Sequence, residues 1–160
     1  MLLGETPLLG LAYLDLDGFK EVNDRYGHAA GDALLREVGS RLGEDVRTLD
    51  TVARLGGDEF ALILPDLGSA AEARRLIERL LERLRGPFVL NGATLPVSVS
   101  LGVSLFPDDG DDAESLTARA DQAMYAAKAA GRNGYRFSGD ALDTGDLGPG
   151  EGGARTGSRG

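Results

Sequence analysis

The chain has 160 residues, a length typical of one domain, and 42% of them are hydrophobic, which is enough to form a sizeable core. It contains no cysteine, which excludes disulfides and thiolate metal sites, and its net charge of −9 argues against general binding to nucleic acid. No apolar run approaches the roughly 18 residues of a membrane span and no signal peptide opens the chain, so we expect a cytoplasmic protein without a membrane segment.

The first half of the chain predicts a buried strand, two helices and a β-hairpin. Gly56 and Gly57 lie between two short apolar segments, and a Gly-Gly pair accepts the positive φ angles that tight hairpin turns require. Pro65 is expected to end the second hairpin strand. The expected elements are a strand over 8–15, a short helix over 18–26, a helix over 29–42, and hairpin strands over 50–55 and 59–64.

The second half predicts two further helices and three strands. Ser69 is a suitable N-cap for a helix that runs to about Arg85 with an apolar stripe. Strands are expected over 88–90, 94–106 and 135–137, and an Ala-rich helix over 112–130. This order predicts an α/β fold, an α+β sandwich whose central, mostly antiparallel sheet is flanked by helices. We expect one domain over 1–137 and a Gly-rich, disordered tail over 138–160.

Two pairs of acidic residues indicate metal chemistry. Asp15 and Asp17 end the first predicted strand, and Asp58 and Glu59 follow the two glycines of the hairpin turn. If the two places meet in the fold, their carboxylates form the hard oxygen site that Mg²⁺ requires. The alternatives are that the strand-end acids cap the following helix and that the hairpin acids form a solvated turn.

Two other places have the chemistry to bind phosphate. The backbone amides of Gly18 and Phe19 begin a helix, where the helix dipole and Lys20 favour an anion. Lys128 and Arg132 lie four residues apart near the end of the last predicted helix. Cations at that position also satisfy the helix dipole, and this alternative remains open at the level of local sequence.

Four separate motifs in matching order and spacing resemble the GGDEF family of diguanylate cyclases. The likeness covers about residues 9–137. The motifs are Asp15-Leu-Asp17-Gly18-Phe19-Lys20 continuing through Asn23, Gly27-His28 and Gly31-Asp32; Arg54-x-Gly56-Gly57-Asp58-Glu59-Phe60; Ser100-Leu-Gly102 with Pro107 and Asp109-Gly110; and Ala120-Asp121 continuing through Met124-Tyr125, Lys128 and Gly131-Arg132-Asn133.

The resemblance implies a fold related to nucleotidyl-cyclase and polymerase palm domains, and it implies roles for individual residues. Asp15, Asp58, Glu59 and the Leu16 carbonyl are expected to bind Mg²⁺ (or Mn²⁺). Asp58 and Glu59 are also the expected catalytic residues, and the resemblance leaves open which of them helps to deprotonate the attacking hydroxyl. Asn23 and Asp32 are expected to read guanine, whose N–H donors suit a carboxylate and an amide. The remaining expected substrate contacts are Gly18, Phe19, Lys20, Gly56, Gly57, Lys128 and Arg132.

The implied reaction joins two GTP molecules into cyclic di-GMP with loss of pyrophosphate. One domain holds one GTP, so a homodimer is expected for catalysis. Members of the family usually begin with an Asp-x-Leu-Thr-like motif and an Asn-Arg pair, whereas this chain starts shortly before Asp15, so we expect a domain without that segment. The alternatives are a non-catalytic module that binds GTP or cyclic di-GMP, and a truncated, inactive domain.

A second ligand site is implied for the product. Arg47 and Asp50 form an Arg-x-x-Asp motif five residues before Gly56, the spacing at which the family carries an inhibitory site. A surface ion pair is the alternative. Arg74, Arg75 or Arg79 are candidates for a second arginine of that site, and the sequence does not choose among them.

Overall fold

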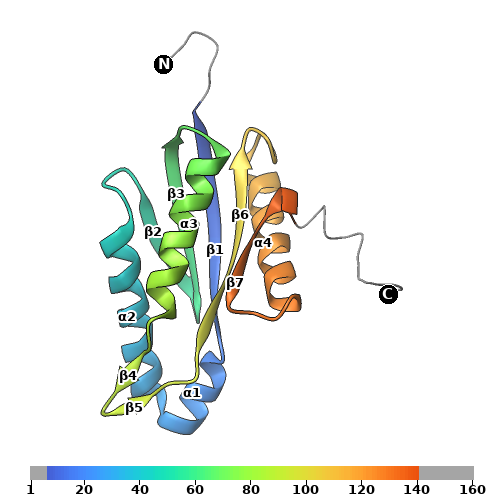
Figure 1. Ribbon diagram of the computed structural model, residues 1–160. Helices are drawn as coiled ribbons and strands as arrows, with labels where there is room; N and C mark the ends of the chain where they lie inside the picture. The colour runs from blue at the N-terminus through green and yellow to red at the C-terminus, as the bar shows by residue number, and fades with distance from the viewer. Residues whose placement is uncertain (1–6, 141–160) are drawn as a thin grey trace, which may run out of the picture.

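A five-stranded sheet forms the centre of the molecule, shown in Figure 1 for the computed structural model, which describes residues 7–140. The strand order is β2-β3-β1-β6-β7, with β6 and β7 parallel and the other neighbours antiparallel. The predicted mostly antiparallel sheet is therefore confirmed. The strands are β1 (Leu8–Asp17), β2 (Thr51–Gly56), β3 (Glu59–Leu67), β6 (Ser98–Phe106) and β7 (Gly134–Phe137).

Helices cover both faces of this sheet. Figure 1 shows α2 and α3 on one face and α4 on the other, with α1 at the end of the sheet where β1 finishes. A separate two-stranded ribbon of β4 (Val89–Leu90) and β5 (Ala93–Thr94) lies near that same end. The helices are α1 (Phe19–Tyr26), α2 (His28–Asp45), α3 (Ala70–Arg85) and α4 (Ala113–Ala129).

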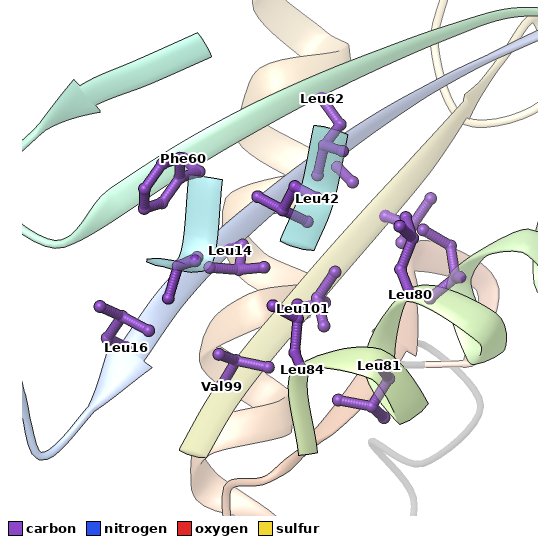
Figure 2. Close-up of a cluster of buried hydrophobic side chains, with 14 of the residues drawn as sticks. Leu14, Leu16, Leu42, Phe60, Leu62, Leu80, Leu81, Leu84, Val99 and Leu101 are labelled. Carbon is purple, nitrogen blue, oxygen red and sulfur yellow. The ribbon is translucent and has the colours of Figure 1, made fainter. Parts of the chain in front are cut away.

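The main hydrophobic core lies between the sheet and the α2–α3 pair. Successive residues of a strand point to opposite faces, and the residues of the central strands that point to this side are mostly buried and apolar. Figure 2 shows how side chains from three strands and two helices meet there. The labelled members are Leu14, Leu16, Leu42, Phe60, Leu62, Leu80, Leu81, Leu84, Val99 and Leu101, all nearly or fully buried.

On the opposite face, α4 lies directly against the backbone of β6. A Cβ atom built on Gly102 would lie 2.1 Å from the Met124 nitrogen and 2.2 Å from the Ala120 oxygen. Only glycine permits this approach, because the atoms in the way belong to the helix backbone and have no rotamer to change. The contact fixes the height of α4 over the sheet, and with it the position of the residues at the C-terminal end of the helix.

Two predicted strand boundaries next to prolines were wrong. The strand expected over 94–106 is interrupted: Thr94 ends β5 and β6 begins at Ser98, because Pro96 has no N–H to donate to a ladder. The strand expected to end before Pro65 continues to Leu67. Pro65 is tolerated because the register of β1 and β3 shifts there, as in a β-bulge.

Contacts with the domain continue slightly beyond its expected end at residue 137. Ser138 is buried, residues 138–140 are helical, and the Asp140 carboxylate pairs with Arg74 at 2.9 Å. The rest of the expected tail, residues 141–160, lies outside the described residues. Within 7–140, no helix is long and apolar enough to cross a membrane.

Candidate functional site

Three segments that are far apart in the sequence converge at one end of the sheet. Here β1 ends, the β2–β3 hairpin turns, α1 begins and α4 finishes (Figure 1). The strand register aligns their polar residues: Asp15 lies opposite Glu59 on β3 and opposite Ser100 on β6, and Asp17 lies opposite Ser98. Directly opposed residues of antiparallel strands point to the same face, so these polar side chains share the α4 side of the sheet.

The hairpin turn has the geometry that its two glycines predict. Gly56 has a φ of 133° and Gly57 a φ of 52°, both in the region that favours glycine. The Arg54 side chain donates a hydrogen bond to the Gly57 carbonyl at 3.1 Å. The Leu16 N–H donates to the Asp58 carbonyl at 3.3 Å, which ties the turn to the end of β1. The acidic turn therefore lies beside the strand-end acids, although Glu59 itself is exposed.

Asp15 and Asp58 form a pair of neighbouring carboxylates. Partial burial and then the adjacent Asp15 carboxylate raise the pKa of Asp58 from 3.8 to about 6. Asp15 Oδ1 is buried and has no hydrogen-bond partner within the described chain. A divalent cation would satisfy this oxygen and remove the repulsion between the two acids, so the residues present fit Mg²⁺.

The protein supplies only part of a metal coordination shell. No group of three or more His, Cys, Asp or Glu side chains placed to hold a metal occurs within residues 7–140. Two carboxylates agree with the behaviour of Mg²⁺ in nucleotide enzymes, where one or two carboxylates bind the ion and phosphates and waters complete the shell.

Lys128 lies directly on this acidic pair. Its Nζ is 2.8 Å from Asp15 Oδ2 and 3.4 Å from Asp17 Oδ1. Burial by itself lowers the pKa of Lys128, but the hydrogen bond to Asp15 and the charges of both aspartates outweigh it and raise the pKa overall. Lys128 is therefore a permanent cation at the site, and it does more than satisfy the dipole of α4.

Asp17 has contacts that the sequence reasoning missed. Its side chain does not cap α1, whose N-cap is Gly18 without any side-chain hydrogen bond, so the capping alternative is wrong. The Asp17 carboxylate instead accepts hydrogen bonds from the Ser98 and Ser100 hydroxyls and from the Asn133 N–H. The sequence contains a matching pattern, Asp-x-Asp at the end of β1 and Ser-x-Ser in β6. Only the register of the two strands shows that these residues lie opposite each other.

Beside Asp17 lies a pocket of about 590 Å³ that contains two of the predicted substrate residues. Gly18 has a φ of 86°, and a Cβ there would lie 2.9 Å from the Pro96 carbonyl. Arg132 lines the pocket from the other side, and its Nε is 3.9 Å from Asp17 Oδ1. The helix start and the cation after α4, predicted separately, thus meet in one pocket.

The other predicted substrate residues lie on α1 and α2. Lys20 is exposed and pairs with Asp24 at 3.7 Å, and Asp32 is also exposed. Asn23 is half-buried against α2, where a Cβ on Gly31 would lie 1.9 Å from the Asn23 Oδ1 atom. This contact places Asn23 beside Gly31, the residue that precedes Asp32 on α2. Phe19 is partly buried and packs against the hydrophobic core.

The predicted inhibitory residues are brought together at the opposite end of the hairpin. Asp50 precedes β2, and its fully buried side chain accepts a hydrogen bond from Arg47 Nη2 at 2.8 Å. Arg47 Nη2 also donates to the Pro65 carbonyl at 2.5 Å, and the hydrogen bond to Asp50 raises the pKa of Arg47. The pair is a hydrogen-bonded turn with the arginine about one-third exposed, which is more than a loose surface ion pair.

This palm-like sheet, with an acidic hairpin turn beside two strand-end aspartates, defines a domain of the nucleotidyl-cyclase type. The family model described as "Diguanylate cyclase, GGDEF domain" matches residues 4–134, so the chain belongs to the GGDEF domain family. The predicted family and fold are thereby confirmed.

Several characterised proteins carry similar domains. The chain is 48% identical over 125 residues to the bifunctional diguanylate cyclase/cyclic di-GMP phosphodiesterase MucR of Pseudomonas aeruginosa, covering 78% of this chain and 18% of MucR. It is 45% identical over 134 residues to the response regulator PleD of Caulobacter vibrioides, covering 82% of this chain and 29% of PleD. A relative named as a cyclic di-GMP phosphodiesterase, NbdA of P. aeruginosa, is 44% identical, over 81% of this chain and 16% of NbdA. The chain thus spans less than a third of each of these three relatives.

Solved structures agree with this assignment. The GGDEF domain of TpbB, also called YfiN, from P. aeruginosa has a TM-score of 0.79 and 41% identity, with 82% of each chain covered. The GGDEF domain of DgcB from Caulobacter crescentus, determined in complex with c-di-GMP, has a TM-score of 0.76 and 32% identity, covering 83% of this chain and 79% of that one.

Proposed function

We propose that this domain is a diguanylate cyclase that condenses two GTP molecules into one cyclic di-GMP and two pyrophosphates. The observation that carries the proposal is the intact acidic pair, Asp15 with Asp58, beside the positively charged Lys128. Non-catalytic use of the fold would not need two carboxylates facing one another with one buried oxygen left without a partner.

In the proposed reaction, the 3′-hydroxyl of each GTP attacks the α-phosphorus of the other GTP, and pyrophosphate leaves. Asp15, Asp58 and the Leu16 carbonyl would hold Mg²⁺ (or Mn²⁺), with Glu59 beside them. The bound ion would lower the pKa of the attacking hydroxyl and neutralise charge on the phosphates. Catalysis by the protein itself then consists mainly of positioning and charge stabilisation.

The remaining residues are proposed to position the nucleotide. Lys128 and Arg132 supply positive charge for the phosphates, and the α1 backbone at Gly18 and Phe19 offers N–H groups together with Lys20. Gly56 and Gly57 leave the hairpin turn free of side chains, which allows a nucleotide to approach its backbone. Asn23 and Asp32 present an amide and an exposed carboxylate to the guanine edge.

Because one domain offers one set of these residues, we propose that catalysis requires a homodimer in which two sites face each other. Two attacks in opposite directions need two GTP molecules related by a two-fold axis. A chain that meets its partner only by diffusion is then expected to be slow at low concentration.

The test is synthesis of cyclic di-GMP from GTP and Mg²⁺ across a series of protein dilutions. Activity per domain should fall on dilution, and fusion to a dimerising coiled coil should remove that dependence. Activity per domain that stays constant in the unfused chain would contradict the dimer requirement. A chain that binds GTP or cyclic di-GMP but makes no product in the fused form would instead be a binding module or an inactive domain.

We also propose that cyclic di-GMP inhibits the domain by binding at Arg47 and Asp50. Supporting this, the Arg47 guanidinium is partly exposed while its fork is already oriented by Asp50 and Pro65. The motif lies at the far end of β2 from the acidic turn, so a ligand there would leave the GTP site free. DgcB, a structural relative, was determined with c-di-GMP bound.

Product-inhibition curves test this second site. Arg47→Ala should remove inhibition by added cyclic di-GMP and preserve synthesis at low product concentration. Arg36→Ala, a change of the same kind at an exposed position of α2, is the matched control. Superimposable inhibition curves for the wild type and Arg47→Ala would contradict the site.

A further inference from the structure

The Asp17 carboxylate lies beside the predicted metal site and contacts Lys128 and Arg132, the two cations predicted to bind phosphate. Only 6% of the residue is exposed, yet it is charged and contacts groups from three elements. Its oxygens accept from Ser98 Oγ at 2.6 Å, Ser100 Oγ at 2.9 Å and the Asn133 N–H at 3.2 Å. They also lie 3.4 Å from Lys128 Nζ and 3.9 Å from Arg132 Nε. Burial of a charge is costly unless it is paired and hydrogen-bonded, and Asp17 is fully satisfied in this way.

The first consequence concerns Lys128. Its ammonium contacts Asp15 and Asp17 together, at 2.8 and 3.4 Å. If a metal ion binds Asp15 and phosphates bind that ion, Lys128 still has Asp17 as its counter-ion and stays beside the site. Without Asp17, the only carboxylate within residues 7–140 that pairs with Lys128 would be Asp15, which the metal also needs. Asp17 therefore holds Lys128 in the same position whether or not Asp15 is bound to a metal ion.

The second consequence concerns the turn that carries Arg132. Arg132 and Asn133 have φ angles of 64° and 51°, a left-handed conformation that is unfavourable for residues other than glycine. Hydrogen bonds hold this turn from both sides: Asp17 accepts from the Asn133 N–H, and Arg85 donates to the Asn133 carbonyl at 2.7 Å and to its Oδ1 at 3.0 Å. The turn directs Arg132 into the pocket that Asp17 and Gly18 also line.

We propose that Asp17 is a positioning residue that fixes Lys128 and Arg132 for the phosphates of GTP. The inference rests on the proposed function, since it assumes that phosphates bind in this pocket. Ser98 and Ser100 on β6 orient the Asp17 carboxylate, so the Asp-x-Asp of β1 and the Ser-x-Ser opposite it act together. Asp17 itself does not touch the reacting atoms in this scheme, and it acts through the two cations.

The binding test compares a non-hydrolysable GTP analogue with guanosine, in the presence of Mg²⁺, for wild type, Asp17→Asn and Asp111→Asn. Asp17→Asn keeps the shape of the side chain and removes its charge. Its affinity for the GTP analogue should fall about tenfold or more, while its affinity for guanosine should stay within about twofold. Asp111 is exposed, so Asp111→Asn is the matched control and should change neither affinity.

A second measurement needs no nucleotide. Hydrogen exchange at the Asn133 amide should be faster in Asp17→Ala, which removes the acceptor, than in the wild type. If Asp17→Ala does not fold, Ser98→Ala provides the milder change, because it removes only one hydrogen bond that orients the carboxylate. In Ser98→Ala, exchange at the Asn133 amide should be faster than in the wild type and affinity for the GTP analogue should be lower, both by smaller amounts than in the Asp17 variants.

Equal losses of affinity for the GTP analogue and for guanosine would overturn the proposal, as would unchanged affinity for both. Unchanged exchange at Asn133 in every folded variant would also overturn it. If the wild-type chain binds guanosine and the GTP analogue to no measurable extent, the proposed function fails, and the exchange experiment still decides whether Asp17 holds the turn.

Discussion

Leu14 and Leu16 on β1 face one side of the sheet, and Asp15 and Asp17, which alternate with them, face the other. The two leucines are at most 2% exposed and pack into the core under α2 and α3. The two aspartates contact Lys128 from α4, and Asp17 also contacts the turn beyond that helix. Because a shift of one residue in strand register would exchange the two sets, the hydrophobic core also fixes where the carboxylates lie.

The most severe loss on the polar side should come from the acidic turn. Asp58→Asn and Glu59→Gln are each expected to reduce cyclic di-GMP synthesis about 10²-fold or more, since each removes a charge at the reacting centre. Both variants should remain folded, as thermal unfolding will show, because both residues lie at the hairpin turn and outside the core. Near-normal synthesis by either purified variant, in a dimerised form, would show that this turn does not carry catalysis.

On the apolar side, the loss should appear in stability. Leu14→Ala removes a fully buried side chain and should lower the free energy of unfolding by about 2–5 kcal/mol. Asp15→Asn, one residue later, should change it by less than about 1 kcal/mol while abolishing synthesis. Urea unfolding of both variants makes the comparison. Equal destabilisation would show that the two faces of β1 are not divided as described.

Gly102→Ala tests how closely α4 is held over the polar face. The new methyl group would meet the backbone at Ala120 and Met124, so we expect destabilisation of about 1–3 kcal/mol and a displaced Lys128. Gly43→Ala is the matched control, because that glycine lies in α2 with no atom within 4 Å of the added Cβ. It should be neutral or stabilising by up to about 1 kcal/mol. A neutral Gly102→Ala would show that α4 can move away without cost.

A smaller effect concerns pH. The folded-state pKa of Asp58, about 6, lies above its ordinary value of 3.8, so the metal-free folded state binds the proton more tightly than the unfolded chain. The resulting stabilisation is fully present below pH 3.8 and is lost as the pH rises through about 6. Melting in EDTA should show this decline, and Asp58→Asn should not. Mg²⁺ should raise the melting temperature more at pH 7.5 than at pH 5, and an equal rise at both would contradict the carboxylate pair as its site.

Local sequence was sufficient to single out residues of the candidate site that are close to one another along the chain or follow a strand period. The Gly56-Gly57 turn and the Arg47–Asp50 pair depend on local geometry: both glycines have positive φ angles, and Arg47 pairs with Asp50. The resemblance to the family predicted the sheet and the helices that flank it. The prediction failed at Pro65 and Pro96, where a bulge and a break in pairing depend on neighbouring strands.

The role of Asp17 could not be predicted from local sequence. Ser98, Ser100 and Asn133 lie 81 to 116 residues away from it, and only the register of β1 against β6 and the position of α4 bring them together. A strand-end aspartate followed by a glycine is also typical of helix capping, so the wrong alternative was locally plausible. Contacts of this kind depend on tertiary structure, which short motifs do not encode.

The central claim is that the polar face of β1 and β3 joins two GTP molecules, and the stoichiometry of the reaction tests it most directly. The chain fused to a dimerising coiled coil should be incubated with GTP and Mg²⁺, and all products quantified by chromatography and mass spectrometry. We predict two pyrophosphates for every cyclic di-GMP formed, and no cyclic product from ATP. Bound GTP that remains unchanged, or that is converted to GDP and phosphate, would contradict the claim.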